Sequence, residues 1–334
     1  MKRNLIQLWG VHCLLGCLVL SFGFTAAAEK AWRSPTNGFW ADGTNWSGGL
    51  PPDITAFIQI TNAGTKIVTI DAATPAATLM VQMLTMSAPP GATNTLLLTD
   101  VGTNNPLVFQ TGLQLDDGAA IRITNSALVV EIPFFHVDLD GSLTLDSGWL
   151  TFSDNTSTAR VGRATSGRLV INGGTAQAGT MTVGGLTNSQ GMVSMTGGNL
   201  DISSLLSIGR NPGTTGTVAV LGGQLSVPND DTRIGDSGVG QMIVSNATAT
   251  LTNLVVGHSA LSVGLLTLQN NGVILLSNDL SIGRFEGSTG SVTVAGGELL
   301  ASGLKIYVGR EGAGQMTVAG GGVQAARLDR KSVV

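Results

Sequence analysis

One unit of the sequence, residues 282–297, reads IGRFEGSTGSVTVAGG and shows the pattern that decides the fold. It starts with a β-branched residue followed by glycine and has a further glycine at 290. It then alternates apolar with small polar residues and ends in a glycine pair. Such alternation predicts a short strand with one buried side and one solvent-facing side. The flanking glycines predict tight turns, because glycine adopts positive φ without a steric penalty.

The same unit recurs seven times between residues 160 and 327. Each copy begins with one of the pairs Val161-Gly162, Val183-Gly184, Ile208-Gly209, Ile234-Gly235, Val256-Gly257, Ile282-Gly283 and Val308-Gly309, at spacings of 22, 25, 26, 22, 26 and 26 residues. The middle glycines are Gly167, Gly191, Gly216, Gly240, Gly264, Gly290 and Gly314, and a Gly or Asn turn begins six residues after each. The spacing between the first two glycines is 5 or 7 residues, whereas the strand segment that follows the middle glycine never varies in length. Because loops tolerate insertions and core strands do not, the varying segment is assigned as a turn.

We therefore predict an all-β fold, a single-stranded parallel β-helix (β-solenoid) with coils of about 22–26 residues and Gly or Asn turns. Each coil holds about three short strands, and stacking at about 4.8 Å per coil buries a continuous apolar column. Regular coils span residues 160–327 and irregular coils span 65–159, which gives about 10–11 coils in all. The alternatives are a β-sandwich or a propeller, but a propeller blade needs about 40–45 residues.

The first 28 residues are predicted to be a signal peptide. Lys2 and Arg3 precede an apolar stretch, and Ala26-Ala27-Ala28 offers a cleavage site before Glu29. A membrane anchor and a lipoprotein signal with lipidation at Cys17 are the alternatives. After cleavage no cysteine remains, so the mature chain is expected to have no disulfide and no thiolate zinc site. Cleavage also removes the apolar stretch, so no membrane span is expected in the mature chain.

Composition excludes several classes of partner. The chain has a formal net charge of −4, 11% charged residues and 43% hydrophobic residues. Low charge with many apolar residues argues against disorder. The absence of a strongly basic region argues against a nucleic-acid partner.

Residues 29–64 form a tryptophan-rich N-terminal segment that contains Trp32, Trp40 and Trp46. We expect a cap that covers the open apolar end of the solenoid. The alternative is a platform of exposed indole rings that stack on carbohydrate.

Two groups of charged residues are candidates for a metal site or a catalytic site. His136, Asp138 and Asp140 alternate along one predicted strand and form a weak candidate metal site, although solvent exposure of polar residues is the simpler interpretation. No cofactor is expected. The acidic group Asp230-Asp231 with Asp236 offers no evident catalytic acid and base pair.

A column of polar residues follows the β-branched–glycine pairs. Its members are Arg163, Gly185, Arg210, Asp236, His258, Arg284 and Arg310. Stacking would align them along one edge, where Arg284 and Arg310 could bind an anionic glycan. Ordinary exposed turn polarity, with Arg210 and Asp236 paired across adjacent coils, is the simpler interpretation.

The β-branched–glycine and Gly-x-Leu-x-Val-x-Gly-Gly units resemble the repeats of type V secretion passengers and of PEP-CTERM-associated surface proteins. The segment from Phe39-Trp40 through Asn45-Trp46 to Pro51 is similar to the start of those proteins. The resemblance covers residues 160–327 and extends to the N-terminal segment. It implies an autotransporter-like β-helical passenger. Residues 328–334 depart from the repeat, so we expect a truncated chain or a different anchor.

Three functions remain open at this point. The first is a non-catalytic structural or adhesive passenger that is secreted or held on the cell surface of a Gram-negative bacterium. Its expected partners are polysaccharide or other surface components. The second is a carbohydrate-binding protein that uses Trp32, Trp40 and Trp46. The third is a polysaccharide-degrading β-helix, which needs an acid and base pair that the sequence does not show.

Overall fold

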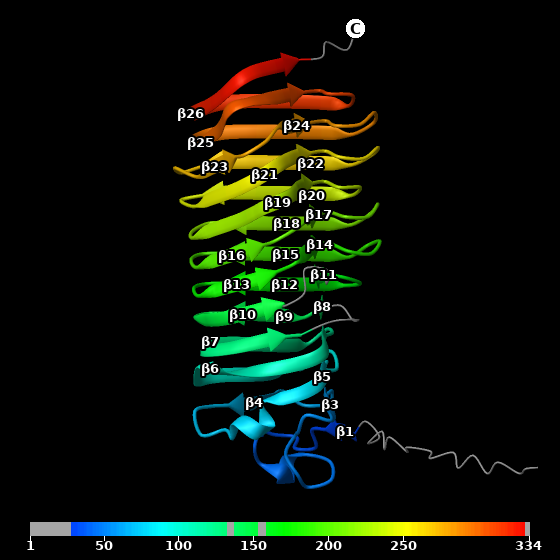
Figure 1. The fold of residues 1–334 in the computed structure, drawn as a ribbon. Coiled ribbons are helices and arrows are strands. Elements are labelled where there is room, and N and C mark those ends of the chain that lie inside the picture. Colours follow the sequence, from blue (N-terminus) through cyan, green and yellow to red (C-terminus); the bar gives the residue numbers. More distant parts are fainter. Residues whose placement is uncertain (1–27, 132–136, 153–157, 331–334) are drawn as a thin grey trace, which may run out of the picture.

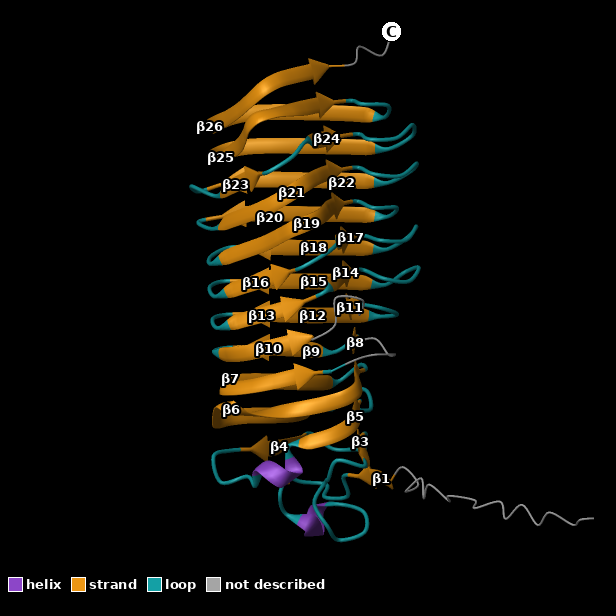
Figure 2. Ribbon diagram, in the orientation of Figure 1, coloured by secondary structure: helices purple, strands orange, loops and turns teal. Residues whose placement is uncertain are grey.

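The chain folds as a parallel β-solenoid in a computed structural model that describes residues 28–131, 137–152 and 158–330. Figure 1 shows the turns stacked in chain order into an elongated body, with the earliest described residues at one end and the latest at the other. Figure 2 shows that strands make up nearly all of it. The helical content of the described residues is two short 3-10 segments, η1 (Gly43–Asn45) and η2 (Ala76–Thr78). No helix in this described part is both long and apolar enough to cross a membrane.

Each turn contributes strands to three stacked faces, and every pairing between named strands is parallel. The first face, which holds the middle glycines, contains β2 (Gly38–Phe39), β4 (Lys66–Ile70), β9 (Ser142–Leu145), β12 (Ser166–Ile171), β15 (Gln190–Met195), β18 (Thr215–Val220), β20 (Val239–Ser245) and β22 (Val263–Gln269). The second face contains β10 (Gly148–Phe152), β13 (Thr175–Ala178), β16 (Asn199–Ile202) and β23 (Val273–Leu276).

The third face contains β1 (Ala28–Ala31), β3 (Ala56–Ile60), β8 (Val137–Leu139), β11 (Thr158–Val161), β14 (Thr180–Val183), β17 (Leu206–Ile208) and β24 (Leu280–Ile282). Longer strands bend around a corner and serve more than one face. These are β5 (Met80–Met86), β6 (Asn94–Leu115), β7 (Ala119–Val130), β19 (Gln224–Ile234), β21 (Thr248–Val256), β25 (Thr289–Val308) and β26 (Ala313–Arg330).

The register confirms the repeat. All seven middle glycines stack on one another, from Gly167 on Gly191 to Gly290 on Gly314. The β-branched residues stack in the same way, from Val161 on Val183 to Ile282 on Val308. A parallel solenoid with Gly and Asn turns is therefore the observed fold.

Two details of the prediction need correction. Eleven successive pairings along the first face join twelve turns, more than the 10–11 expected, because the earliest coils lack the glycine signature. The regular pairing also continues past residue 327, since Leu328 and Arg330 lie beside Ile306 and Val308.

Close backbone approach at one corner explains why the glycines recur. The backbone φ angle of Gly209 is 67°, and residues other than glycine rarely adopt such positive values. A Cβ on Gly216 would collide with the carbonyl oxygen of Val183 and with the amide nitrogen of Gly209. The corner therefore requires glycine at both positions in every regular turn.

The interior is one continuous apolar core that runs from Trp32 to Ile306. Val161, Val183 and Ile208, which stack on the third face, are each 0% exposed. Burial of such columns drives the stacking, since a single coil cannot cover its own apolar side.

The first turns fill the glycine column differently. Lys66 stacks on Asn94, and Asn94 stacks on Ala119, which precedes the first glycine of the column at 141. The Lys66 ammonium is fully buried and donates to the carbonyl oxygens of Asn62 (2.7 Å) and Gly64 (3.0 Å) and to Oδ1 of Asn94 (2.7 Å). Burial lowers the pKa of Lys66 below its usual range.

The N-terminal expectations concern two different parts of the chain. The proposed signal peptide lies outside the described residues except for Ala28, the first residue of β1. The segment expected to be a cap is itself a turn of the solenoid, because β1 pairs with β3 and β2 pairs with β4.

Candidate functional site

The three N-terminal tryptophans close the end of the core. Trp32, Trp40 and Trp46 are 2%, 0% and 1% exposed, and the Trp46 ring meets the other two edge-on at centroid distances of 5.0 and 5.1 Å. Two of the indole N–H groups make internal hydrogen bonds: Nε1 of Trp40 donates to the carbonyl oxygen of Thr78 (2.9 Å) and Nε1 of Trp46 to that of Trp40 (2.7 Å). This is the arrangement expected of a cap, and it leaves no indole face free to stack on a sugar.

The proposed metal ligands Asp138 and Asp140 do not converge. Asp138 accepts hydrogen bonds from Nε (2.6 Å) and Nη2 (3.0 Å) of Arg160, and Nη1 of Arg163 lies 3.4 Å from it. Asp140 is buried and accepts from the backbone N–H groups of Ala164 and Thr165, at 2.9 and 3.1 Å.

The expectation that these side chains share one strand face is wrong for Asp140, because β8 ends at Leu139 and Asp140 belongs to the corner. His136 lies outside the described residues. Among the residues that are described, no group of three metal-ligating side chains occurs.

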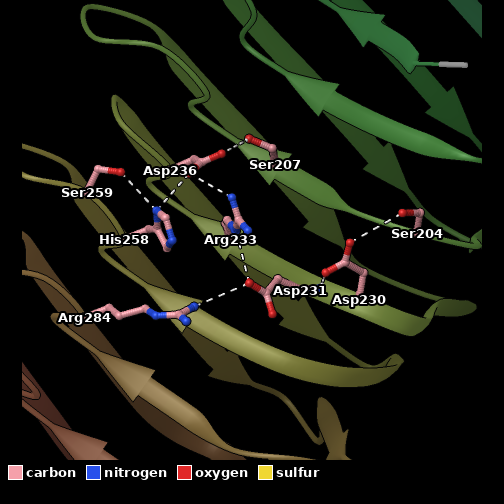
Figure 3. Close-up of polar contacts among 9 residues, drawn as sticks. All are labelled: Ser204, Ser207, Asp230, Asp231, Arg233, Asp236, His258, Ser259 and Arg284. Carbon is pink, nitrogen blue, oxygen red and sulfur yellow. Dashed lines mark hydrogen bonds and ion pairs between the residues drawn. The ribbon is translucent and has the colours of Figure 1, made fainter. Parts of the chain in front are cut away.

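A network of charged side chains connects four turns on the third face and its corner (Figure 3). We call it the third-face cluster; it comprises Ser204, Ser207, Asp230, Asp231, Arg233, Asp236, His258, Ser259 and Arg284. Ser207 is on β17 and Arg233 is on β19, whereas Asp236, His258 and Arg284 follow the β-branched–glycine pairs of three successive turns. The third-face cluster therefore combines residues of the polar column predicted from the sequence with residues that point outward from the strands.

Asp236 is the most enclosed carboxylate of the cluster, at 8% exposed. It accepts a hydrogen bond from Oγ of Ser207 (2.8 Å), lies 3.1 Å from Nδ1 of His258 and lies 3.6 Å from Nη1 of Arg233. Burial alone would raise the pKa of Asp236. The hydrogen bonds from His258 and Ser207 and the charges of Arg233 and His258 outweigh burial and hold its pKa below the usual range.

Asp231 links the cluster along the stack. Nε of Arg233 lies 3.2 Å from Asp231, and Nη1 of Arg284, from two turns further on, lies 3.4 Å from it. The Arg284 guanidinium also lies over the Phe285 ring, 5.3 Å from the centroid, and His258 meets that ring edge-on. These contacts tie successive turns together.

Although the cluster contains serine, histidine and aspartate, it does not form a nucleophile relay. In a hydrolase triad the imidazole lies between the serine and the carboxylate, with one ring nitrogen toward each. Here Asp236 lies between Ser207 and His258, and Oγ of Ser259 lies 3.0 Å from the same Nδ1 that contacts Asp236. Ser207 therefore contacts the carboxylate and not the imidazole, and Ser259 shares Nδ1 of His258 with Asp236, so neither serine has its own ring nitrogen opposite the carboxylate.

The expected pairing of Arg210 with Asp236 is wrong. Arg210 instead donates from Nη1 to Oγ1 of Thr182 at 3.2 Å, because Asp236 turns toward Arg233 and His258. Of the two arginines proposed as ligand-binding, Arg284 is bound within the cluster, whereas Arg310 is exposed and lies over the Tyr307 ring at 4.9 Å.

The sequence interpretation missed one exposed aromatic residue. Trp149 on β10 is 46% exposed and stands over a shallow depression of about 330 Å³ lined with Thr103, Pro106 and Val129. Its exposure could be predicted from its place next to the buried Leu150, since neighbouring residues of a strand face opposite sides.

These features define the chain as a parallel β-solenoid with a capped N-terminal end and polar contacts along one corner. Comparison with known protein families, with curated proteins and with solved structures finds no match.

Proposed function

We propose that this protein is an exported, non-catalytic β-solenoid with a structural or adhesive role on the cell surface or outside the cell. The observation that carries the proposal is that the carboxylates of the third-face cluster bind side chains of the solenoid itself. Asp231 and Asp236 are each bound by basic or hydroxyl groups from neighbouring turns. A catalytic carboxylate would instead face a space that substrate can enter.

Export is supported by the sequence of residues 1–28 and by the resemblance to type V secretion and PEP-CTERM-associated repeat proteins. A long rod also suits a surface role, because stacked turns project a large area from one chain. An autotransporter-like passenger from a Gram-negative bacterium is the form of this proposal that the repeats favour.

Carbohydrate binding through Trp32, Trp40 and Trp46 receives no support from their burial. Exposed Trp149, with threonine hydroxyls beside it, is the feature that keeps a carbohydrate-binding role as the second candidate. A polysaccharide-degrading activity would need a paired acid and base, and the candidate acidic cluster does not supply one.

Expression of the full chain in a Gram-negative host tests the proposal. We expect the N-terminus of the product to be Glu29, the protein to be sensitive to protease added to intact cells, and the expressing cells to adhere more strongly than cells that carry an empty vector. The control is Ala26→Arg, which disrupts the small-residue cleavage site and should leave the precursor uncleaved. Retention in the cytoplasm with Met1 intact would contradict export, and product release from a panel of polysaccharides would contradict a non-catalytic role.

A further inference from the structure

The corner column opens into a cleft between Arg163 and Arg210. Three successive turns place Arg163, Gly185 and Arg210 at equivalent positions, since the Gly185 amide bonds to the Gly162 carbonyl (2.8 Å) and the Arg210 amide to the Gly184 carbonyl (3.0 Å). Two strand spacings separate the arginine backbones by about 10 Å. Because Gly185 has no side chain, the middle turn places no side chain at the position between the two arginines.

The resulting cleft has a volume of about 320 Å³. Its walls include Arg160, Arg163, Thr182, Gly185, Arg210 and Asn211. The volume suits a single charged group of a larger ligand, and hydroxyl and amide groups lie beside the guanidinium groups.

Among the described residues, the arginines of this cleft outnumber the carboxylates that pair with them. Arg160 and Arg163 share one carboxylate, Asp138, which Arg160 holds with two hydrogen bonds, and Arg210 has no carboxylate partner. Arg163 contacts that carboxylate at 3.4 Å through Nη1, and its Nε is buried with no hydrogen-bond partner among the described residues. Arg210 is exposed and donates to a neutral hydroxyl, Oγ1 of Thr182.

We propose that this cleft binds the carboxylate or sulfate group of an acidic polysaccharide, with Arg163 and Arg210 as the binding residues. A guanidinium group stays charged at every physiological pH and matches an oxyanion with two parallel hydrogen bonds. Arg160 holds Asp138 with two hydrogen bonds, and the Asp138 side chain is 13% exposed. The identification of a polymer as the ligand rests on the proposed surface function, whereas the anion site rests on the cleft itself.

A glycan fits the surroundings better than a nucleic acid does. The described residues that line the cleft include no aromatic ring, whereas single-stranded nucleic acids are bound by stacking on aromatic side chains. Duplex binding requires many phosphate contacts, and this chain carries a net charge of −4. The cleft lies on the outer corner of an elongated rod, where a polymer can pass across it.

Calorimetric titration of the purified full chain tests this inference. The probes are a polygalacturonate oligosaccharide, a chondroitin sulfate oligosaccharide of matched length, a neutral dextran oligosaccharide and a DNA duplex. We expect binding of an acidic oligosaccharide that weakens with added salt, and no binding of dextran. Uronate binding, sulfate binding or both support the site, and the comparison identifies which anion it takes.

Three variants locate the site. Arg210→Gln is expected to weaken binding about tenfold, because it removes an exposed guanidinium that forms no ion pair in the described structure. Arg163→Gln combined with Arg210→Gln is expected to abolish binding. The matched control is Arg168→Gln, an exposed arginine of the same turn on the first face, which should change affinity less than about twofold.

Unchanged affinity in Arg210→Gln and in the double variant, each with a wild-type melting curve, would overturn the inference. Tighter binding of DNA than of either acidic oligosaccharide would overturn the glycan assignment. An exported, adhesive protein that binds no acidic oligosaccharide would refute this inference alone, whereas glycan binding by a chain retained in the cytoplasm would refute the proposed function instead.

Discussion

Nζ of Lys66 donates a 2.7 Å hydrogen bond to Oδ1 of Asn94, at the column position that glycine occupies in the later turns. In this early coil 28 residues separate the stacked pair Lys66 and Asn94, more than the 22–26 residues of the regular coils. Asn94 is itself fully buried and donates to the carbonyl oxygen of Ser87 at 2.6 Å. Hydrogen bonds between side chains and backbone therefore hold this corner, whereas direct backbone contact holds the regular ones.

Lys66→Met is expected to destabilise the fold by about 2–4 kcal/mol, because methionine keeps the apolar stem but removes the donor of three hydrogen bonds, one of them to the buried Oδ1 of Asn94. The measurement is urea unfolding followed by far-ultraviolet circular dichroism. Lys305→Met is the control, since Lys305 is exposed and its backbone amide, which the substitution keeps, donates the hydrogen bond to Oδ1 of Asp279. A loss at Lys66 no larger than the loss at Lys305 would show that the buried ammonium is not needed.

Gly216→Ala is expected to cost about 3 kcal/mol or more, since its methyl group meets the backbone of both Val183 and Gly209, which cannot move aside without breaking the strand register. Gly322→Ala is the control, because its Cβ would have no heavy atom nearer than 4.0 Å and its φ is not positive. Thermal unfolding measured on both variants gives the comparison. Equal melting temperatures would mean that the corner relaxes more easily than the packing implies.

The regular turns could be predicted because their constraints repeat. Gly216 and its equivalents meet the same backbone atoms in each coil, so the same residue type recurs and the register follows from the sequence. The number of early turns could not be predicted correctly, because Lys66 and Asn94 occupy the column position of the glycines and so remove the repeating residue that marks a turn.

The side-chain partners of the third-face cluster were much less predictable. Outward-facing positions differ from turn to turn, and the partner of Asp236 depends on which neighbouring side chain is long enough to reach it. The column position of Arg210 predicts a contact with Asp236, but Arg233, three residues from Asp236, and His258 are the residues that reach that carboxylate. The cleft was missed for a related reason, since it is created by a residue without a side chain, Gly185.

Trp149→Phe is expected to remove most of the tryptophan fluorescence that acrylamide can quench, in a chain that begins at Glu29. Trp149 is 46% exposed, whereas the other three tryptophans of that chain are at most 2% exposed. The control is Trp40→Phe, which should lower total emission and leave the quenchable part unchanged. Strong quenching in the Trp149→Phe protein would mean that the N-terminal cap opens in solution.

Asp236→Asn is expected to lower the free energy of unfolding by about 1–3 kcal/mol at pH 7, because the amide keeps the shape but loses the charge that Arg233 and the hydrogen-bond donors stabilise. The hydrogen bonds from His258 and Ser207 and the charge of Arg233 hold the folded-state pKa of Asp236 below the usual range of an aspartate. Its carboxylate therefore contributes stability above the unfolded-state pKa and loses that contribution as pH falls through the folded-state pKa.

The difference in unfolding free energy between the wild type and Asp236→Asn should accordingly be full at neutral pH and shrink below about pH 4. Urea unfolding at a series of pH values measures it. Glu286→Gln serves as the control, because Glu286 is exposed and the change removes the same charge without touching the cluster. A difference that stayed constant from neutral to acidic pH would show that shape, and not ionisation of Asp236, accounts for its contribution. A difference that grew on acidification would mean that the folded state raises the pKa of this carboxyl group, contrary to the arrangement of Ser207, Arg233 and His258 around it.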